Sequence, residues 1–422
     1  MSREMVNSGI PWVGEIPKCW TIELIGNQVK EVDNPNTNGE ECNALQFKMG
    51  TIISKSKGDS KYNPETLEGY NIVDKGVIML NGLNLSFDFI SQRVGLVKER
   101  GVITSTYFAV KPTPNIDSEF LTYLFKAYDN CKAFHSMGRG LRQTLSYGEL
   151  RKYLLVYPPL SEQQRIAEFL DRKCAEVDEM IALQEQIIEE LKAYKQSVIT
   201  EAVTKGLNPA VPMRDSGIDW IGSIPEHWEV KRLKQESTFI NGFAFDSEDF
   251  KIDEGIKVIR IGDIGLQVDF ENCVRATTDA SLLSSYKIAD GDILIAMSGA
   301  TTGKCCIVEK AEEAYINQRV GIIRSDVRKL IYYSLLTPYF MEFVNLNNAG
   351  SAQPNISSKA IGEFPIIIMP PTEQQAIADY LDEKCADIDS LIQTKQSKID
   401  SLKEYKKSII YEYVTGKKEV NE

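Results

Sequence analysis

Two stretches of the chain are nearly the same sequence written twice: "SEQQRIAEFLDRKCAEVDEMI" (Ser161–Ile181) and "TEQQAIADYLDEKCADIDSLI" (Thr372–Ile392). Their offset is 372 − 161 = 211 positions. A second pair, "SGIPWVGEIPKCW" from Ser8 and "SGIDWIGSIPEHW" from Ser216, repeats at 216 − 8 = 208 positions. Two distant blocks with nearly equal offsets indicate that one structural unit occurs twice in the chain.

The repeated stretches are predicted to be long helices. A Ser or Thr followed three residues later by Gln, just after a proline, fits a capping box at Ser161 and at Thr372. Apolar or small residues then recur in steps of three and four, as in the seam of a coiled coil. The seam positions are Ile166, Leu170, Cys174, Val177, Ile181, Ile188, Leu191 and Val198, then Ile377, Leu381, Cys385, Ile388, Ile392, Ile399, Leu402 and Ile409, with polar Gln184 and Lys395 interrupting them.

Such a helix needs a partner for its apolar stripe. From Ser161 to Thr204 it spans roughly 65 Å at about 1.5 Å per residue, and a narrow seam on a helix of that length stays exposed unless something covers it. Pairing of the two repeated helices with each other is one solution. The alternative is that each helix folds back on its own β-rich half.

The segments between the repeats share an outline but not a sequence. Each has β-branched runs broken by Gly, Asn and Asp, such as "KGVIML" from Lys75 and "DGDILIAM" from Asp290. A helical stretch, a Gly-containing loop and a further strand follow in both halves. The tetrapeptide "QRVG", which follows Ser91 and Asn317, is interpreted as a coincidence, with Arg93 one strand earlier than Arg319. The predicted class is α+β.

Composition is that of a globular protein without membrane spans: 422 residues, 43% hydrophobic and 26% charged, with no apolar run long enough to cross a bilayer. The start of the chain lacks a signal-peptide core, so a cytoplasmic location is expected. The net charge of −12 suggests that partners supply part of any phosphate contact. Eight scattered cysteines and two histidines do not have the spacing of a metal site, and none is expected.

No catalytic motif is complete. "SGATTGKCC" from Ser298 resembles a phosphate loop, but three residues separate its glycines and Cys305 follows Lys304, where the Walker pattern needs four residues and a Ser or Thr. The acidic run from Phe245 is more typical of a solvated turn than of nuclease carboxylates. The chain is therefore expected not to be an enzyme.

The repeats resemble those of the specificity subunits of type I DNA restriction–modification systems. The resemblance is carried by "PPLSEQQRIAEFLDRKCAEVDEMI", "PPTEQQAIADYLDEKCADIDSLI", the two W-[VI]-G-x-I-P-x-x-W segments and the order variable–helix–variable–helix. It implies two β-rich target-recognition domains separated by two long antiparallel coiled-coil helices, in a pseudo-two-fold internal repeat. The implied ranges are 1–157 and 207–369 for the recognition domains, and 158–206 and 370–422 for the helices.

The resemblance also implies a function and partners. The chain is expected to read a split, asymmetric double-stranded DNA sequence and to direct two methyltransferase subunits, and two restriction subunits, to it. S-adenosylmethionine would belong to the methyltransferase subunits, and ATP and Mg to the restriction subunits, with no cofactor on this chain. Helix length would set the number of unread base pairs between half-sites. A non-catalytic scaffold whose β domains bind protein or glycan partners is the alternative.

Candidate DNA-binding residues follow from the family's use of the Gly-containing loop. Arg, Gln, Asn and Lys side chains can pair with base edges in the major groove. Arg139, Arg142 and Gln143 are nominated in the first half, and Gln353 and Asn355 in the second. Further nominations in the second half are Phe243, Thr301, Thr302, Lys304 and Gln318.

Overall fold

The structure is a computed structural model that describes residues 3–37, 39–55, 67–140, 143–251, 254–348 and 354–420. It contains two compact units, one made of Met1–Glu185 with Gln396–Glu422 and the other of Gln186–Lys395. Each long helix contributes to both units. The four domain ranges expected from the sequence place their boundaries near the ends of the long helices, whereas the two units divide within these helices. The four expected ranges stay a prediction.

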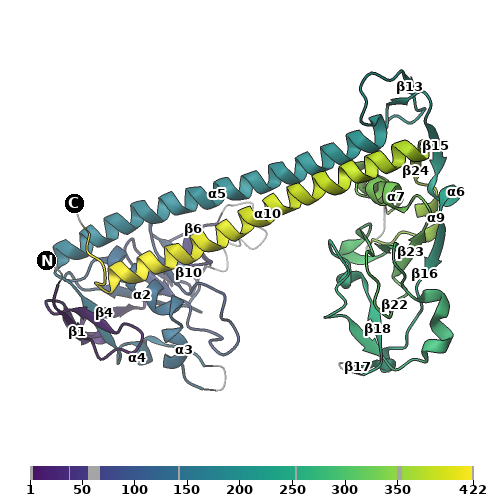
Figure 1. Cartoon of the computed structure of the whole chain (residues 1–422). Coiled ribbons are helices and arrows are strands. Elements are labelled where there is room, and N and C mark those ends of the chain that lie inside the picture. The colour runs from purple at the N-terminus through teal and green to yellow at the C-terminus, as the bar shows by residue number, and fades with distance from the viewer. Residues whose placement is uncertain are drawn as a thin grey trace. The chain divides into compact units, whose positions relative to one another are not determined.

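The first unit consists of short strands and helices followed by the start of the first long helix (Figure 1). Its elements are β1 (Met5–Asn7), β2 (Glu15–Pro17), β3 (Thr21–Leu24), α1 (Ile25–Gln28), β4 (Val29–Val32), β5 (Leu45–Lys48), β6 (Thr51–Ser54), β7 (Asn71–Val73), β8 (Ile78–Leu80), β9 (Val94–Leu96), β10 (Gly101–Ile103), β11 (Phe108–Pro112), α2 (Ser118–Asn130), α3 (Ala133–Met137), α4 (Tyr147–Leu150) and β12 (Leu154–Tyr157). The central sheet has the order β4-β11-β8-β9, with antiparallel neighbours throughout.

The second unit repeats this plan with additions. Its elements are β13 (Met213–Asp215), β14 (Ser223–Pro225), β15 (Glu229–Arg232), α6 (Leu233–Glu236), β16 (Thr238–Asn241), β17 (Phe250–Lys251), β18 (Ile256–Ile259), β19 (Val274–Ala276), β20 (Ile293–Ala296), β21 (Cys305–Ile307), β22 (Ala314–Ile316), β23 (Val320–Arg324), α7 (Arg328–Leu335), α8 (Pro338–Asn347), α9 (Ser358–Gly362) and β24 (Pro365–Ile368), with short 3-10 turns at 247–249, 261–263, 280–286 and 299–301. The sheet order β16-β23-β20-β21 matches that of the first unit strand for strand. A second sheet, β17-β19-β18-β22, packs beside it.

The strand orders identify equivalent positions in the two units. β9 corresponds to β21, and β11 corresponds to β23, because each occupies the same place in its sheet. Arg93 directly precedes β9, whereas Arg319 directly precedes β23. The two "QRVG" segments therefore lie at different places in the fold, which confirms the interpretation of their likeness as a coincidence. Arg93 lies two strands earlier than Arg319, not one as expected, because β22 stands between β21 and β23.

The long helices are α5 (Leu160–Lys205) and α10 (Pro371–Val414). Most seam positions are buried and the others half-buried, as the periodicity predicts. The capping-box prediction is wrong in detail, because each helix begins one residue ahead of its Ser or Thr. The glutamine at the fourth helical position closes the start instead: Gln163 Nε2 donates to the Pro158 carbonyl and Gln374 Nε2 to the Met369 carbonyl, at 2.8 and 2.7 Å.

Within each unit the helices pack antiparallel, so the pairing expected from the seam is confirmed. In the first unit Lys406 Nζ lies 2.7 Å from Asp178, and Ile166 and Leu170 share a core with Ile409. In the second unit Lys195 Nζ lies 2.7 Å from Asp389. The two ion pairs are copies of each other, displaced by 406 − 195 = 211 and 389 − 178 = 211 positions.

The Trp/Pro segments fix each β-rich half to a helix end. Trp20 packs near the C-terminal end of α10 in the first unit, and Trp228 packs against the C-terminal end of α5 in the second. The N- and C-terminal segments of the chain meet in the first unit, where Arg3 bridges Glu162 and Glu419. Among the helices of the described ranges, none combines the length and apolar character that crossing a bilayer requires.

Candidate nucleic-acid interface

Three connections meet at one end of the central sheet in the second unit. They are the β20–β21 connection, the turn ahead of β23 and the segment around Asn355. The Met297 N–H donates to the Arg319 carbonyl, and the Ile356 N–H donates to the Met297 carbonyl, each at 2.9 Å. The Gly299 N–H donates to the Pro354 carbonyl at the same distance. These main-chain bonds hold three segments that are distant in sequence as one surface.

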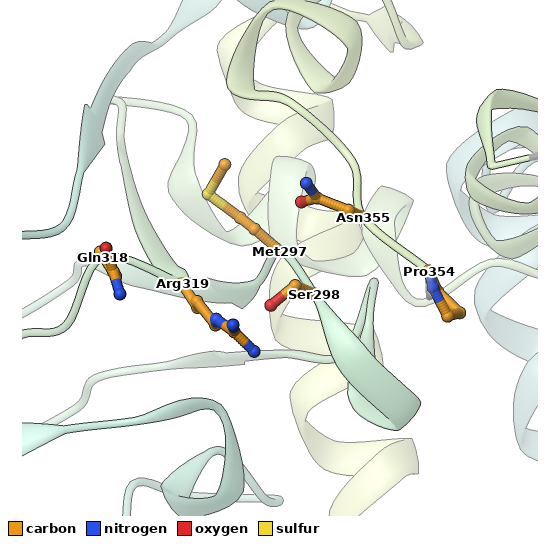
Figure 2. A pocket seen from close by; sticks show the side chains of 6 residues that line it. All are labelled: Met297, Ser298, Gln318, Arg319, Pro354 and Asn355. Carbon is orange, nitrogen blue, oxygen red and sulfur yellow. The ribbon is translucent and has the colours of Figure 1, made fainter. Parts of the chain in front are cut away.

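This surface contains a hollow of about 260 Å³ lined by Met297, Ser298, Gln318, Arg319, Pro354 and Asn355 (Figure 2). Gln318, Arg319 and Asn355 are exposed, whereas Ser298 is only 7% exposed. Within the described ranges the Ser298 hydroxyl has no hydrogen-bond partner, and it points toward the side of the hollow where the Arg319 guanidinium lies. A buried hydroxyl without a partner carries a desolvation cost that a bound polar group would offset.

The chemistry of this lining is that of base-edge recognition. Arginine forms paired hydrogen bonds with guanine, and glutamine or asparagine does so with adenine. The Arg319 side chain is exposed and lines the hollow, so its guanidinium is accessible to a ligand. The hollow therefore combines an exposed cation, two side-chain amides and a hydroxyl on segments that main-chain bonds hold together.

The nominated residues of the second half differ in their positions relative to the hollow. Gln318 and Asn355 line the hollow, and Lys304 is exposed on the β20–β21 connection beside it. The Thr302 hydroxyl is buried and donates to the Gly299 carbonyl at 2.7 Å, so it holds this connection closed. Thr301 is half-buried, with its hydroxyl 3.4 Å from the Ile261 carbonyl. Phe243 packs in an aromatic cluster, and Gln353 lies outside the described residues.

The first unit brings the corresponding connections together. The Leu145 N–H donates to the Gly82 carbonyl at 2.9 Å, as the Ile356 N–H does to the Met297 carbonyl. Arg139 and Gln143 are both exposed on the loop that ends at Leu145, and Arg139 pairs with Thr144 across this loop. Arg142 lies outside the described residues. The nominated Arg139 and Gln143 therefore occupy the same end of the sheet as the hollow of the second unit.

The β8–β9 connection of the first unit is organised by a buried arginine. Arg93 is 1% exposed, and its guanidinium donates to the carbonyls of Asn81, Leu83 and Asp88 at 3.1, 2.7 and 2.6 Å. Its backbone N–H donates to Asp129 at 2.8 Å, and burial raises the pKa of that carboxyl. One residue thus ties the whole connection together.

Sequence reasoning missed Arg319 and Ser298 as members of the site. Arg319 directly precedes β23. Ser298 is the second residue after β20, following Met297. Both positions become informative only when β20 and β23 are known to be neighbours in the sheet. The signal in the sequence was the placement of polar residues at strand ends on one side of the sheet.

The two units together define a class of protein: an internally repeated chain with two β-rich units, in each of which parts of the two long helices pack against each other. The sequence profile of the family described as "Type I restriction modification DNA specificity domain" matches residues 90–193 and 225–404. The chain belongs to this family.

Individual relatives agree with this assignment. The type I restriction enzyme MjaVIII specificity subunit of Methanocaldococcus jannaschii is 25% identical over 418 residues, which cover 95% of this chain and 93% of that protein. The EcoKI specificity subunit of Escherichia coli (strain K12) is 27% identical over 232 residues, covering 52% of this chain and 47% of that protein. A solved chain from work on assembly and conformational transition of the type I R-M system superposes with a TM-score of 0.69 at 16% identity, covering 94% of this chain and 98% of that one. That likeness shows a shared fold.

Proposed function

We propose that this chain selects the DNA site for a type I restriction–modification complex, and that each unit reads one half of a split target sequence. The observation that carries the proposal is the repeated surface at one end of the same four-stranded sheet. In one unit this surface presents Arg319, Gln318 and Asn355, and in the other it presents Arg139 and Gln143. One framework with two unlike sets of base-reading side chains suits an asymmetric target with two half-sites.

The chain performs no chemistry itself under this proposal. In support, burial raises the pKa of Cys306 to about 12 and also raises the pKa of Cys305, so neither thiol of the phosphate-loop-like segment is available as a thiolate nucleophile. Two methyltransferase subunits would hold S-adenosylmethionine and flip out the adenine that they modify. Two restriction subunits would supply ATP and Mg. The complex would act on cellular DNA in the cytoplasm.

Methylated adenines in DNA from cells that carry this chain and its methyltransferase subunits test the proposal. We expect one split sequence with a fixed spacer to be modified, and none in cells that lack the chain. Binding of the purified complex to that sequence should weaken steeply as salt rises, because phosphate contacts release counterions. Binding indifferent to sequence and salt would favour the scaffold function instead. Deleting about one helical turn from α5 is expected to change the tolerated spacer.

A further inference from the structure

The β8–β9 connection of the first unit presents large apolar side chains to solvent. Phe87 is 76% exposed, Ile90 is 86% exposed, and Phe89 between them is 54% exposed. Isolated exposed apolar residues are ordinary, but three within four positions at the tip of one connection form a patch that needs an explanation.

This tip is rigidly held. Arg93 binds three carbonyls from beneath, as described above. The Phe89 ring stacks on His135, with centroids 4.8 Å apart and planes at 15°, and Lys132 Nζ donates to the Phe89 carbonyl at 2.5 Å. The backbone N–H and hydroxyl of Ser91, the largest causes, lower the pKa of Asp88 to about 2. The apolar side chains are therefore displayed on a pre-organised base.

Backbone strain is concentrated around the same tip. Within the described ranges, the non-glycine residues with positive φ are Met49, Asn84, Lys132 and Gln143, at 47, 53, 59 and 43°. Asn84 belongs to the connection, Lys132 binds it through Phe89, and the Gln143 carbonyl accepts from the Leu85 N–H at 3.1 Å. Met49 precedes Gly50, where an added Cβ would lie 2.9 Å from the Cβ of Gln92. Strain of this kind clusters where a surface is shaped for binding.

The tip lies against the loop that carries the nominated base-reading residues of this unit. Besides the Leu85–Gln143 and Leu145–Gly82 bonds, Gly138 approaches Leu85 so closely that a Cβ there would lie 2.7 Å from Cδ1. Arg139 is therefore on a loop that is bonded directly to the apolar tip. A cationic loop and an apolar tip on one rigid surface are the two parts of a DNA-bending element.

We propose that Phe87 and Ile90 enter the DNA of the first half-site as an apolar wedge that partly unstacks one base step. This inference rests on the proposed function and deepens it, because it assigns a specific mode of recognition to the first unit. Wedges of Phe, Leu, Ile or Met kink a duplex by partial unstacking, and the resulting deformability of the step contributes to sequence preference. DNA is favoured over a protein partner because the connection that carries the tip is bonded to the loop of Arg139 and Gln143.

Fluorescence of 2-aminopurine measures unstacking directly. The probe is placed at each position of the first half-site in turn, and the chain is used in complex with its methyltransferase subunits. We expect a several-fold increase at one step apart from the methylated adenine, which the double variant Phe87→Ser/Ile90→Ser abolishes while weakening binding about tenfold. The signal of the flipped adenine should persist in the variant.

The matched control is Ile22→Ser/Leu24→Ser, which removes two exposed apolar side chains from β3 of the same unit. This control should leave the fluorescence and the affinity unchanged, and all variants should keep the melting temperature of the parent. Sequence-specific binding without a signal that depends on Phe87 and Ile90 refutes the wedge alone. Loss of methyltransferase subunits from the Phe87→Ser/Ile90→Ser complex refutes it in favour of a protein contact. Failure of the parent complex to bind any split sequence refutes the proposed function as well.

Discussion

The connection between the third and fourth strands of the central sheet differs sharply between the two units. In the first unit residues 81–93 form a long loop with a buried arginine beneath an apolar tip. In the second unit residues 297–304 form a shorter loop beside a polar hollow. Both start with the same main-chain bond, from Asn81 N–H to the Arg93 carbonyl and from Ala296 N–H to the Lys304 carbonyl.

Arg93 and Lys304 therefore occupy the same position in the two units but do opposite things. Arg93 turns inward and is 1% exposed, whereas Lys304 is exposed. The shared sheet therefore determines where each recognition surface lies, and loop length and side-chain direction determine which side chains that surface presents. Functional side chains commonly sit on loops that a rigid framework positions.

Replacing these two cations should separate their roles most strongly. Arg93→Met removes the donor for three carbonyls and leaves Asp129 buried beside an apolar group. We expect the free energy of unfolding of the first unit to fall by about 3–5 kcal/mol, measured by denaturant titration, with loss of first-half-site recognition. Lys304→Met should leave stability unchanged and weaken only DNA binding. Equal stability losses in the two variants would contradict the comparison.

Arg319→Ala should produce the next largest effect. Loss of paired hydrogen bonds to a base costs about 1–3 kcal/mol of discrimination at one position. Because the Arg319 side chain is exposed, the free energy of unfolding should be unaffected. Binding to targets substituted base by base measures the change. A uniform loss across all sequences would indicate a phosphate contact instead.

Ser298→Ala should weaken DNA binding without lowering the free energy of unfolding. The hydroxyl bonds no group of the described residues, so removing it should not lower the free energy of unfolding. If the hydroxyl binds a base edge, DNA affinity should fall by about 1 kcal/mol. Thr302→Ala is the contrasting variant, because its hydroxyl already bonds Gly299 and its loss should destabilise the loop. Unchanged affinity in Ser298→Ala would remove Ser298 from the site.

Removing the ion pairs between the long helices should give the smallest changes in the free energy of unfolding. These pairs also allow the two units to be compared at equivalent positions of the helices. Lys195 and Asp389 side chains are 18 and 39% exposed, while Lys406 and Asp178 are 29 and 59% exposed. We expect Lys195→Met to cost about 0.5 kcal/mol and Lys406→Met less, since solvent screens the more exposed pair. Thermal unfolding of both variants at low and high salt is the measurement. A larger cost for Lys406→Met would reverse the expected order.

The repeat, the α+β class and the paired helices were predictable, because the 208- and 211-residue offsets and the seam are written in the sequence. Gln318, Asn355, Arg139 and Gln143 were nominated with the help of a likeness to a family; all four are exposed, and their contact with DNA stays a prediction. The role of Arg93 could not be foreseen, since nothing in "SQRVG" tells whether its guanidinium points inward. Ser298 required knowledge of which strands are neighbours. Side-chain direction and strand order depend on tertiary packing, which local patterns do not encode.

Selection of bound sequences from randomised split targets tests most directly whether each unit reads its own half-site. The parent complex, Arg139→Ala and Arg319→Ala would be compared under identical salt. We predict that Arg319→Ala flattens base preference in one half-site only and that Arg139→Ala flattens it in the other half-site only. Flattening of the same half-site by both variants, or of both half-sites by either one, would contradict the account.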